Sequence, residues 1–108
     1  MANDLPARAE EMKHTIAEIV FRHHAWGKGR TYPSKEQFHV NPHAETERQI
    51  SDLSQAVSVI DIYDSLRSER AYKEPFEAAV VRRILIGKFP AKDYPDLQRL
   101  INFLTAQK

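Results

Sequence analysis

The chain lacks cysteine altogether and has no long hydrophobic run. Without cysteine it cannot form a disulfide, use a thiolate as a nucleophile or hold zinc through sulfur. Residues 1–14 contain no apolar core of a signal peptide, and the longest apolar run is far too short for a membrane span. These absences predict a cytoplasmic protein that has no membrane partner.

The chain also lacks an excess of charge of either sign, because 16 basic side chains face 15 acidic ones. A net charge of +1 gives no general electrostatic reason to bind a nucleic acid polymer. What is present is an ordinary globular composition, with 42% hydrophobic and 29% charged residues. We therefore expect a single domain over residues 1–108, whose small core would profit from a docking partner or self-association.

Apolar residues spaced at three and four positions predict helices, and no segment of useful length alternates as a strand does. The first helix is expected at about 5–24, where one face carries Ala9, Met12, Ile16, Ile19 and Val20. The second is expected at 45–68, where a wide apolar stripe predicts burial on more than one side. Residues 25–44 contain glycines and prolines without a sustained period, which predicts a long loop.

Two further helices are expected in the last third of the chain. Glu74-Pro75 would open the third, and Gly87 would cap its C-terminus. Asp93 with Pro95 would open the fourth, whose apolar face is formed by Leu97, Leu100, Ile101 and Leu104. The predicted fold class is all-α, with about four helices in one domain.

His23 and His24 at the end of the first helix are candidate metal ligands, because neutral imidazole binds many metal ions. Adjacent histidines on a helix point about 100° apart, which favours two metals, or one metal and one substrate, over a shared ion. Two surface histidines are the plainer alternative. His14, His39 and His43 are expected on the surface, because Pro42 denies the last two a helical chelating geometry.

Asp61 falls within the apolar second helix and would need a partner if it were buried. It is either a metal-ligating carboxylate or half of an ion pair with an arginine such as Arg70 or Arg48. Arg70 and Lys73, in the polar connector that follows, suit phosphate recognition, although capping and ion pairing at a helix junction are the plainer alternative.

Two aromatic residues, Trp26 and Tyr32, flank the glycines of the long loop. They would form either a stacking platform for a nucleobase or an anchor that fixes the loop to the core.

The order of these features resembles the HD-GYP family of metal-dependent phosphohydrolases. That family carries a stretch like H-H-E-x-x-D-G-x-G-Y-P, and residues 23–33 here read HHAWGKGRTYP. It then carries a helix with a segment like A-D-x-x-D-A-L-T-S-x-R-P-Y-K, and residues 60–73 read IDIYDSLRSERAYK. The resemblance spans roughly residues 12–105, with the second segment the more specific.

The resemblance implies an HD-domain-like partial helical bundle, of the kind that hydrolyses cyclic di-GMP with iron, manganese or zinc ions. By position, His23, His24 and Asp61 would be metal ligands. Arg70 and Lys73 would hold substrate phosphates, and a cyclic dinucleotide would be the ligand. Tyr32 and Pro33 would be the surviving part of the GYP signature, which in the family is also linked to protein partners.

Departures from the family pattern weaken the expectation of catalysis. The chain has no His-Asp dipeptide, Ala25 stands where glutamate is usual, and Lys28 stands where aspartate is usual. Thr31 replaces the glycine of GYP. The remaining ligands are too few for a two-metal hydrolytic site, and no residue is assigned a catalytic role. A degenerate domain of this kind would hold no cofactor at all if the site is lost.

Three functions are compatible with this sequence. The favoured one is a non-catalytic interaction or signalling module, which as a half-domain would expose apolar surface and form a homodimer or dock on a partner protein. The second is a phosphodiesterase whose site another chain or a missing segment completes. The third is a cyclic-nucleotide binder without turnover, which would need Arg70 and Lys73 but no metal.

Overall fold

The computed structural model describes residues 4–29, 32–68 and 74–106. Within these ranges the regular structure consists of four α-helices and two 3-10 turns, without a strand, so the all-α expectation is confirmed. The helices and turns in chain order are α1 (Asp4–Arg22), η1 (His23–Ala25), η2 (Lys35–Gln37), α2 (Ala44–Arg67), α3 (Ala78–Lys88) and α4 (Leu97–Ala106).

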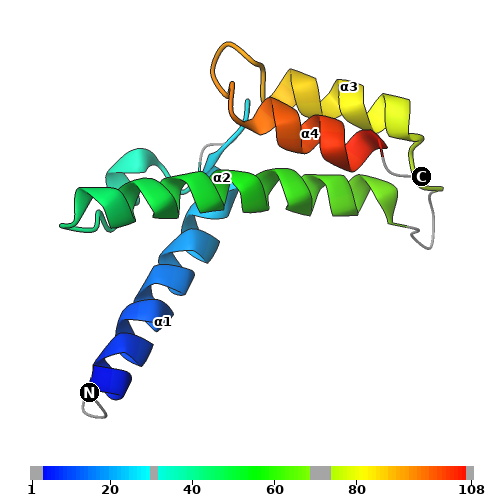
Figure 1. Ribbon diagram of the computed structural model, residues 1–108. Helices are drawn as coiled ribbons and strands as arrows, with labels where there is room; N and C mark the ends of the chain where they lie inside the picture. Colours follow the sequence, from blue (N-terminus) through cyan, green and yellow to red (C-terminus); the bar gives the residue numbers. More distant parts are fainter. Residues whose placement is uncertain (1–3, 30–31, 69–73, 107–108) are drawn as a thin grey trace.

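Helix α2 is the longest element, with 24 residues, and it contacts each of the other three helices. Figure 1 shows α3 and α4 lying together along α2. In contrast, only the C-terminal end of α1 meets α2, and the rest of α1 points away from the molecule. Helix α1 begins at the tip that lies farthest from the other helices. No helix in the described ranges is both long and apolar enough to cross a membrane.

The hydrophobic core lies where α2, α3 and α4 meet. The face predicted for the fourth helix is confirmed, because Leu97 and Ile101 are buried and Leu100 and Leu104 pack against them. The buried core residues are Trp26, Val59, Ile62, Val81, Leu85, Phe89, Leu97 and Ile101.

The loop that follows η1 is anchored to this core. The Trp26 side chain is buried, and its indole N–H donates a hydrogen bond of 2.8 Å to the Ser54 hydroxyl of α2. Gly27 has a φ of 96°, and a Cβ there would lie 3.2 Å from the Phe89 ring, so this position suits glycine. Of the two alternatives for Trp26, the core anchor is the one observed.

The third helix begins later and ends later than predicted. It starts at Ala78 instead of at Glu74-Pro75, and the carbonyl of Glu77 accepts the first hydrogen bonds of the helix. Residues 74–77 stay outside the helix, and the Phe76 N–H donates to the Leu66 carbonyl at the end of α2. Gly87 is not the cap, since α3 continues to Lys88 and the fully buried Phe89 closes it.

Helix α2 contacts α1 on one side and α3 and α4 on another, but the wide apolar stripe predicted for it is covered only in part. Ile50, Val59 and Ile62 are buried, but Leu53, Val57 and Ile60 remain exposed, because no other described element covers that side of the helix. The first helix also ends at Arg22, slightly before the predicted boundary, and the two histidines form the 3-10 turn η1.

Candidate metal centre

The structure brings together the three residues that the sequence suggested as metal ligands. Ligand atoms of His23, His24 and Asp61 all lie within 4.8 Å of one another. The histidines belong to η1 and Asp61 to the C-terminal third of α2, so residues far apart in sequence come together. Within the described ranges, no other trio of histidine, aspartate or glutamate side chains converges in this way.

The two imidazoles lie side by side in spite of their adjacent positions. Their ring centroids are 3.9 Å apart with an angle of 41° between the ring planes. The expectation that they would diverge assumed regular α-helical geometry, which ends at Arg22. In the 3-10 turn η1 the two rings lie together, with ligand atoms within 4.8 Å of each other, which allows them to share one ion.

Hydrogen bonding favours one tautomer of His23. Its Nδ1 lies against the backbone carbonyl of Val20, and because a carbonyl only accepts, this contact favours the tautomer with the proton on Nδ1. The lone pair then resides on Nε2, which is the nitrogen available to a metal. A backbone carbonyl that orients a ligating histidine in this way is a common feature of metal sites.

The donor set fits a single divalent ion of the imidazole-binding class. Two nitrogens and one carboxylate oxygen suit zinc, iron or manganese. Ligand atoms on one tetrahedral ion with bonds of about 2.1 Å lie roughly 3.4 Å apart, so modest side-chain rotations would bring the trio onto one ion. Such an ion would keep at least one coordination position for water or for a group from another molecule.

A buried ion network fixes the junction that carries these ligands. The guanidinium of Arg22 is fully buried and is held by Glu18 Oε2 at 2.7 Å, by Glu47 Oε1 at 2.9 Å and by Ser51 Oγ at 3.1 Å. It also donates to the His39 carbonyl at 3.1 Å. Because Arg22 immediately precedes His23, this network sets where η1 lies relative to α2.

The charges in the network stabilise one another. The hydrogen bond from Arg22 lowers the pKa of Glu47 below its ordinary value in spite of partial burial. Burial alone would raise the pKa of Glu18, but hydrogen bonds from Arg22 and His39 outweigh it and lower that pKa. The pKa of Arg22 is raised in the same way, because the two carboxylates outweigh the effect of its burial.

Sequence reasoning missed this network. The spacing of Glu18 and Arg22, four residues apart on one helix, was the only local signal. The pairing with Glu47 joins residues 25 positions apart and depends on the tertiary fold.

The surroundings of Asp61 remove one of the two arginines that its sequence position suggested as an ion-pair partner. Asp61 is exposed and does not pair with Arg48, which instead binds Glu45 within the first turns of α2. Arg70 and Lys73, the predicted phosphate-binding residues, lie outside the described residues.

The remnant of the GYP signature is divided between surface and interior. Tyr32 is exposed and meets Phe21 edge to face with ring centroids 6.2 Å apart, whereas Pro33 is buried. Lys28 is exposed, and its backbone N–H donates to the Lys88 carbonyl at 2.9 Å, which directs this segment toward the α3–α4 connection.

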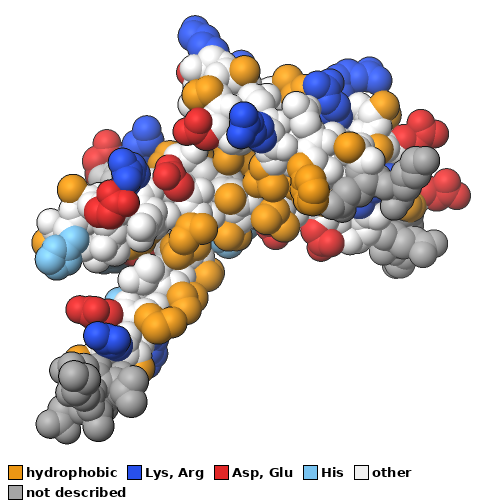
Figure 2. All heavy atoms as spheres, viewed as in Figure 1, with side chains coloured by type: hydrophobic (Ala, Val, Ile, Leu, Met, Phe, Trp, Pro, Cys, Tyr) orange, Lys and Arg blue, Asp and Glu red, His pale blue; other side chains and the backbone are white. Residues whose placement is uncertain are grey.

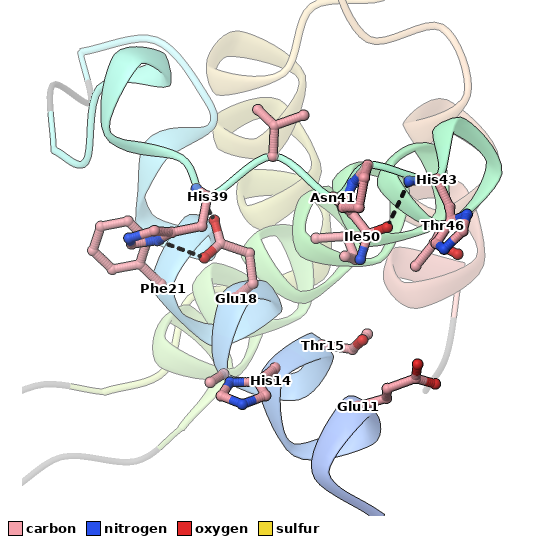
Figure 3. Close-up of a pocket in the computed structure, with 13 residues that line it drawn as sticks. Glu11, His14, Thr15, Glu18, Phe21, His39, Asn41, His43, Thr46 and Ile50 are labelled. Carbon is pink, nitrogen blue, oxygen red and sulfur yellow. Dashed lines mark hydrogen bonds and ion pairs between the residues drawn. The ribbon is translucent and has the colours of Figure 1, made fainter. Parts of the chain in front are cut away.

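A hollow of about 630 Å³ lies elsewhere, between α1 and the segment that leads into α2 (Figure 3). His14, His39 and His43 all line it, and all three are exposed as predicted. Figure 3 shows His39 turned toward Glu18, with His14 and His43 on opposite walls. Because these imidazoles do not converge, the hollow is a poorer metal site than the trio at the junction.

Comparison with known proteins adds no relative. No protein-family model matches the chain, and no curated protein or solved structure matches it either. The similarity to the HD-GYP signature therefore stays a prediction from the residues quoted above.

Proposed function

We propose that this chain is a degenerate HD-GYP-like signalling module that binds one divalent metal ion at His23, His24 and Asp61 and acts by associating with another polypeptide. The convergence of these three ligand atoms within 4.8 Å supports the proposal most directly. They are the residues that the signature segments mark as ligands, and they come from separate elements. The module would work in the cytoplasm, with a second copy or a partner protein on its exposed side.

The proposal excludes hydrolysis by the isolated chain on the basis of its ligand set. A two-metal phosphohydrolase site needs about four to six donors for each ion, many of them from the protein. The trio supplies three, and Ala25 stands in η1 where the signature has a further carboxylate. A bound ion would then orient the junction and a partner's ligand, since water would complete its coordination in the free chain.

A second candidate is a phosphodiesterase whose site is completed by another chain. One observation favours it: three protein ligands with open positions is also the arrangement of many catalytic mononuclear metal sites. In that case the metal would supply Lewis-acid chemistry, and Arg70 and Lys73 would bind the phosphates of a cyclic dinucleotide. The partner would have to contribute the remaining ligands.

Metal content tests the site itself. Protein stripped with a chelator and reloaded separately with Mn²⁺, Fe²⁺ and Zn²⁺ should retain about one ion per chain for at least one of them. Asp61→Asn should weaken binding at least about tenfold, because a neutral amide replaces the carboxylate ligand. Asp52→Asn, on an exposed acid of the same helix, is the matched control and should leave the content unchanged. Metal-free protein under all three conditions would refute the proposal.

Turnover separates the two candidates. Metal-loaded protein should not hydrolyse cyclic di-GMP, as followed by chromatography of the nucleotide products. Hydrolysis that disappears in Asp61→Asn and persists in Asp52→Asn would establish the second candidate and contradict the non-catalytic one.

A further inference from the structure

Helix α1 turns its polar face toward the protein and its apolar face toward solvent. The hydrogen bonds that join it to α2 come from the buried Arg22, which the buried Glu18 holds in place from within α1. On the other side of the helix, Met12, Ile16 and Val20 are 55–63% exposed. An amphipathic helix of a complete domain has the opposite arrangement, with its apolar stripe facing the core. The apolar face of α1 therefore lacks the surface that it fits.

A second unpartnered stripe runs along α2. Leu53, Val57 and Ile60 lie at steps of four and three on one face and are 37–52% exposed. Figure 2 shows hydrophobic side chains gathered along α1 and continuing onto α2 at the elbow between the two helices. The stripes are similar in length, since Met12–Val20 and Leu53–Ile60 span about 12 and 10 Å at the helical rise of 1.5 Å per residue.

The exposed area is in excess of what a monomer of this size presents. The chain exposes 8055 Å², whereas a compact protein of 12.5 kDa exposes about 6,200 Å². Its radius of gyration is 16.3 Å, against about 13 Å for a compact domain of this length. The difference in area is larger than the roughly 800 Å² that each partner buries in a stable interface.

The charges beside the two stripes are complementary, which favours a second copy of the chain as the occupant. Arg8 and Lys13 flank the apolar stripe of α1, three or four residues from Met12 and Ile16. Asp64 stands four residues beyond Ile60 at the end of the α2 stripe. Arg8, Lys13 and Asp64 are all exposed, and none of them forms an ion pair with another described residue.

We propose that two copies form a two-fold dimer in which α1 of each protomer lies antiparallel along the exposed face of α2 of the other. The antiparallel direction places Arg8 and Lys13, the cations that flank the α1 stripe, beside Asp64 at the end of the partner's α2 stripe. The same pairing occurs twice, as two-fold symmetry requires. This inference rests on the proposed function, because association is how the module would act, and it places the interface beside the metal ligands.

The oligomeric state tests the dimer directly. Sedimentation and light scattering of the full chain should show a concentration-dependent dimer, also in the presence of a chelator. Ile16→Glu and Val57→Glu should each raise the dissociation constant about 30-fold or more, because each places a charge in the centre of the interface. Phe103→Glu is the control, because Phe103 is also an exposed apolar residue but lies on α4, and it should not change the constant. Helical circular dichroism would show that each variant still folds.

Charge exchange tests the antiparallel pairing. Lys13→Glu and Asp64→Lys should each raise the dissociation constant of the dimer about threefold or more, because each places like charges opposite each other. The two substitutions together in one chain should restore the wild-type constant, because α1 of each protomer meets α2 of the other and the charges are again opposite. A dimer that the double exchange leaves weakened would overturn the antiparallel arrangement.

Other outcomes would overturn the dimer itself. One is a protein that stays monomeric up to about 1 mM. Another is a dimer whose dissociation constant is unchanged by Ile16→Glu and Val57→Glu. A third is a wild-type monomer that binds anionic vesicles, with binding abolished by Ile16→Glu. A dimer in protein that cannot bind metal would leave this inference standing while refuting the proposed metal site.

Discussion

Helix α2 packs against α1 near its N-terminal half and against α3 and α4 further along, and the two contacts use different side chains. Toward α3 and α4 it presents Val59 and Ile62, which belong to the apolar core. Toward α1 it presents Glu47 and Ser51, which bind the buried Arg22. The first contact follows the usual rule of apolar burial, and the second orients a helix without hiding its apolar face.

This difference has an energetic consequence. Apolar packing depends on area and tolerates small shifts, whereas a buried ion network is favourable only when every charge keeps its partner. The α2–α3–α4 body should therefore carry most of the free energy of unfolding. The α1–α2 junction should contribute less to that free energy and should instead determine how η1 and the metal ligands are oriented.

The largest effect is expected from truncating the body. Phe89 is fully buried and meets Tyr94 edge to face with ring centroids 5.3 Å apart. Phe89→Ala should lower the free energy of unfolding by about 3–5 kcal/mol through lost burial and the cavity left behind. Urea denaturation would measure this loss. Phe103→Ala, at an exposed phenylalanine, should change stability by less than about 0.5 kcal/mol; equal losses in the two variants would contradict the assigned core.

The next largest effect is expected at the junction. Arg22→Met removes the shared cation and leaves Glu18 and Glu47 facing each other, which should cost about 3 kcal/mol or more. The loss should be local, so hydrogen exchange should accelerate in α1 and η1 before it does in α3 and α4. Arg48→Met breaks an exposed pair with Glu45 and should cost no more than about 0.5 kcal/mol. Uniform acceleration over all helices would show that the junction and the body unfold together.

Acid should weaken the junction more than the body. The pKa of Glu47 is lowered from 4.5 mainly by Arg22, and that of Glu18 is lowered from 4.5 despite its burial. Below about pH 4.5 the unfolded chain binds more protons than the folded one. The stabilisation by these carboxylates is therefore present above that pH and is lost as the pH falls through their lower folded values.

The pH dependence of urea denaturation would measure this effect between pH 6 and pH 3. Glu47→Gln should flatten the decline, because the variant has one acid-sensitive carboxylate fewer in the network. Asp52→Asn, at an exposed acid, should leave the slope as in the wild type. A steeper decline in Glu47→Gln would contradict the direction assigned to its pKa.

The same contrast explains how much of the molecule could be predicted from its sequence. The four helices and the buried face of α4 follow from local periodicity, which a sequence displays directly. The interior role of Glu18 and Arg22 could not be found in this way, because it depends on Glu47 from a separate helix. The burial of α2 was overestimated because a wide apolar stripe does not show which partner covers it, or whether that partner belongs to the same chain.

The metal ligands could be predicted from the sequence only in part. Neither the histidine pair nor Asp61 was distinctive alone, and only the order of two signature segments connected them. Their convergence in space depends on the angle between α1 and α2, which the sequence does not display.

The smallest change in the free energy of unfolding is expected at two buried serines, which lie one turn apart on α2. The Ser54 hydroxyl accepts from Trp26 and donates to the Ser51 carbonyl, whereas the buried Ser58 hydroxyl has no hydrogen-bond partner among the described residues. Ser54→Ala should lower the free energy of unfolding by about 1–2 kcal/mol, because it leaves the Trp26 indole N–H unsatisfied. Ser58→Ala should be neutral or stabilise the protein by up to about 1 kcal/mol, because it removes a hydroxyl that is desolvated without compensation. Urea denaturation of both variants would measure the difference. A destabilised Ser58→Ala would show instead that this hydroxyl binds a group at the edge of the core, such as an internal water molecule, and that polar contacts extend from the junction further into the body.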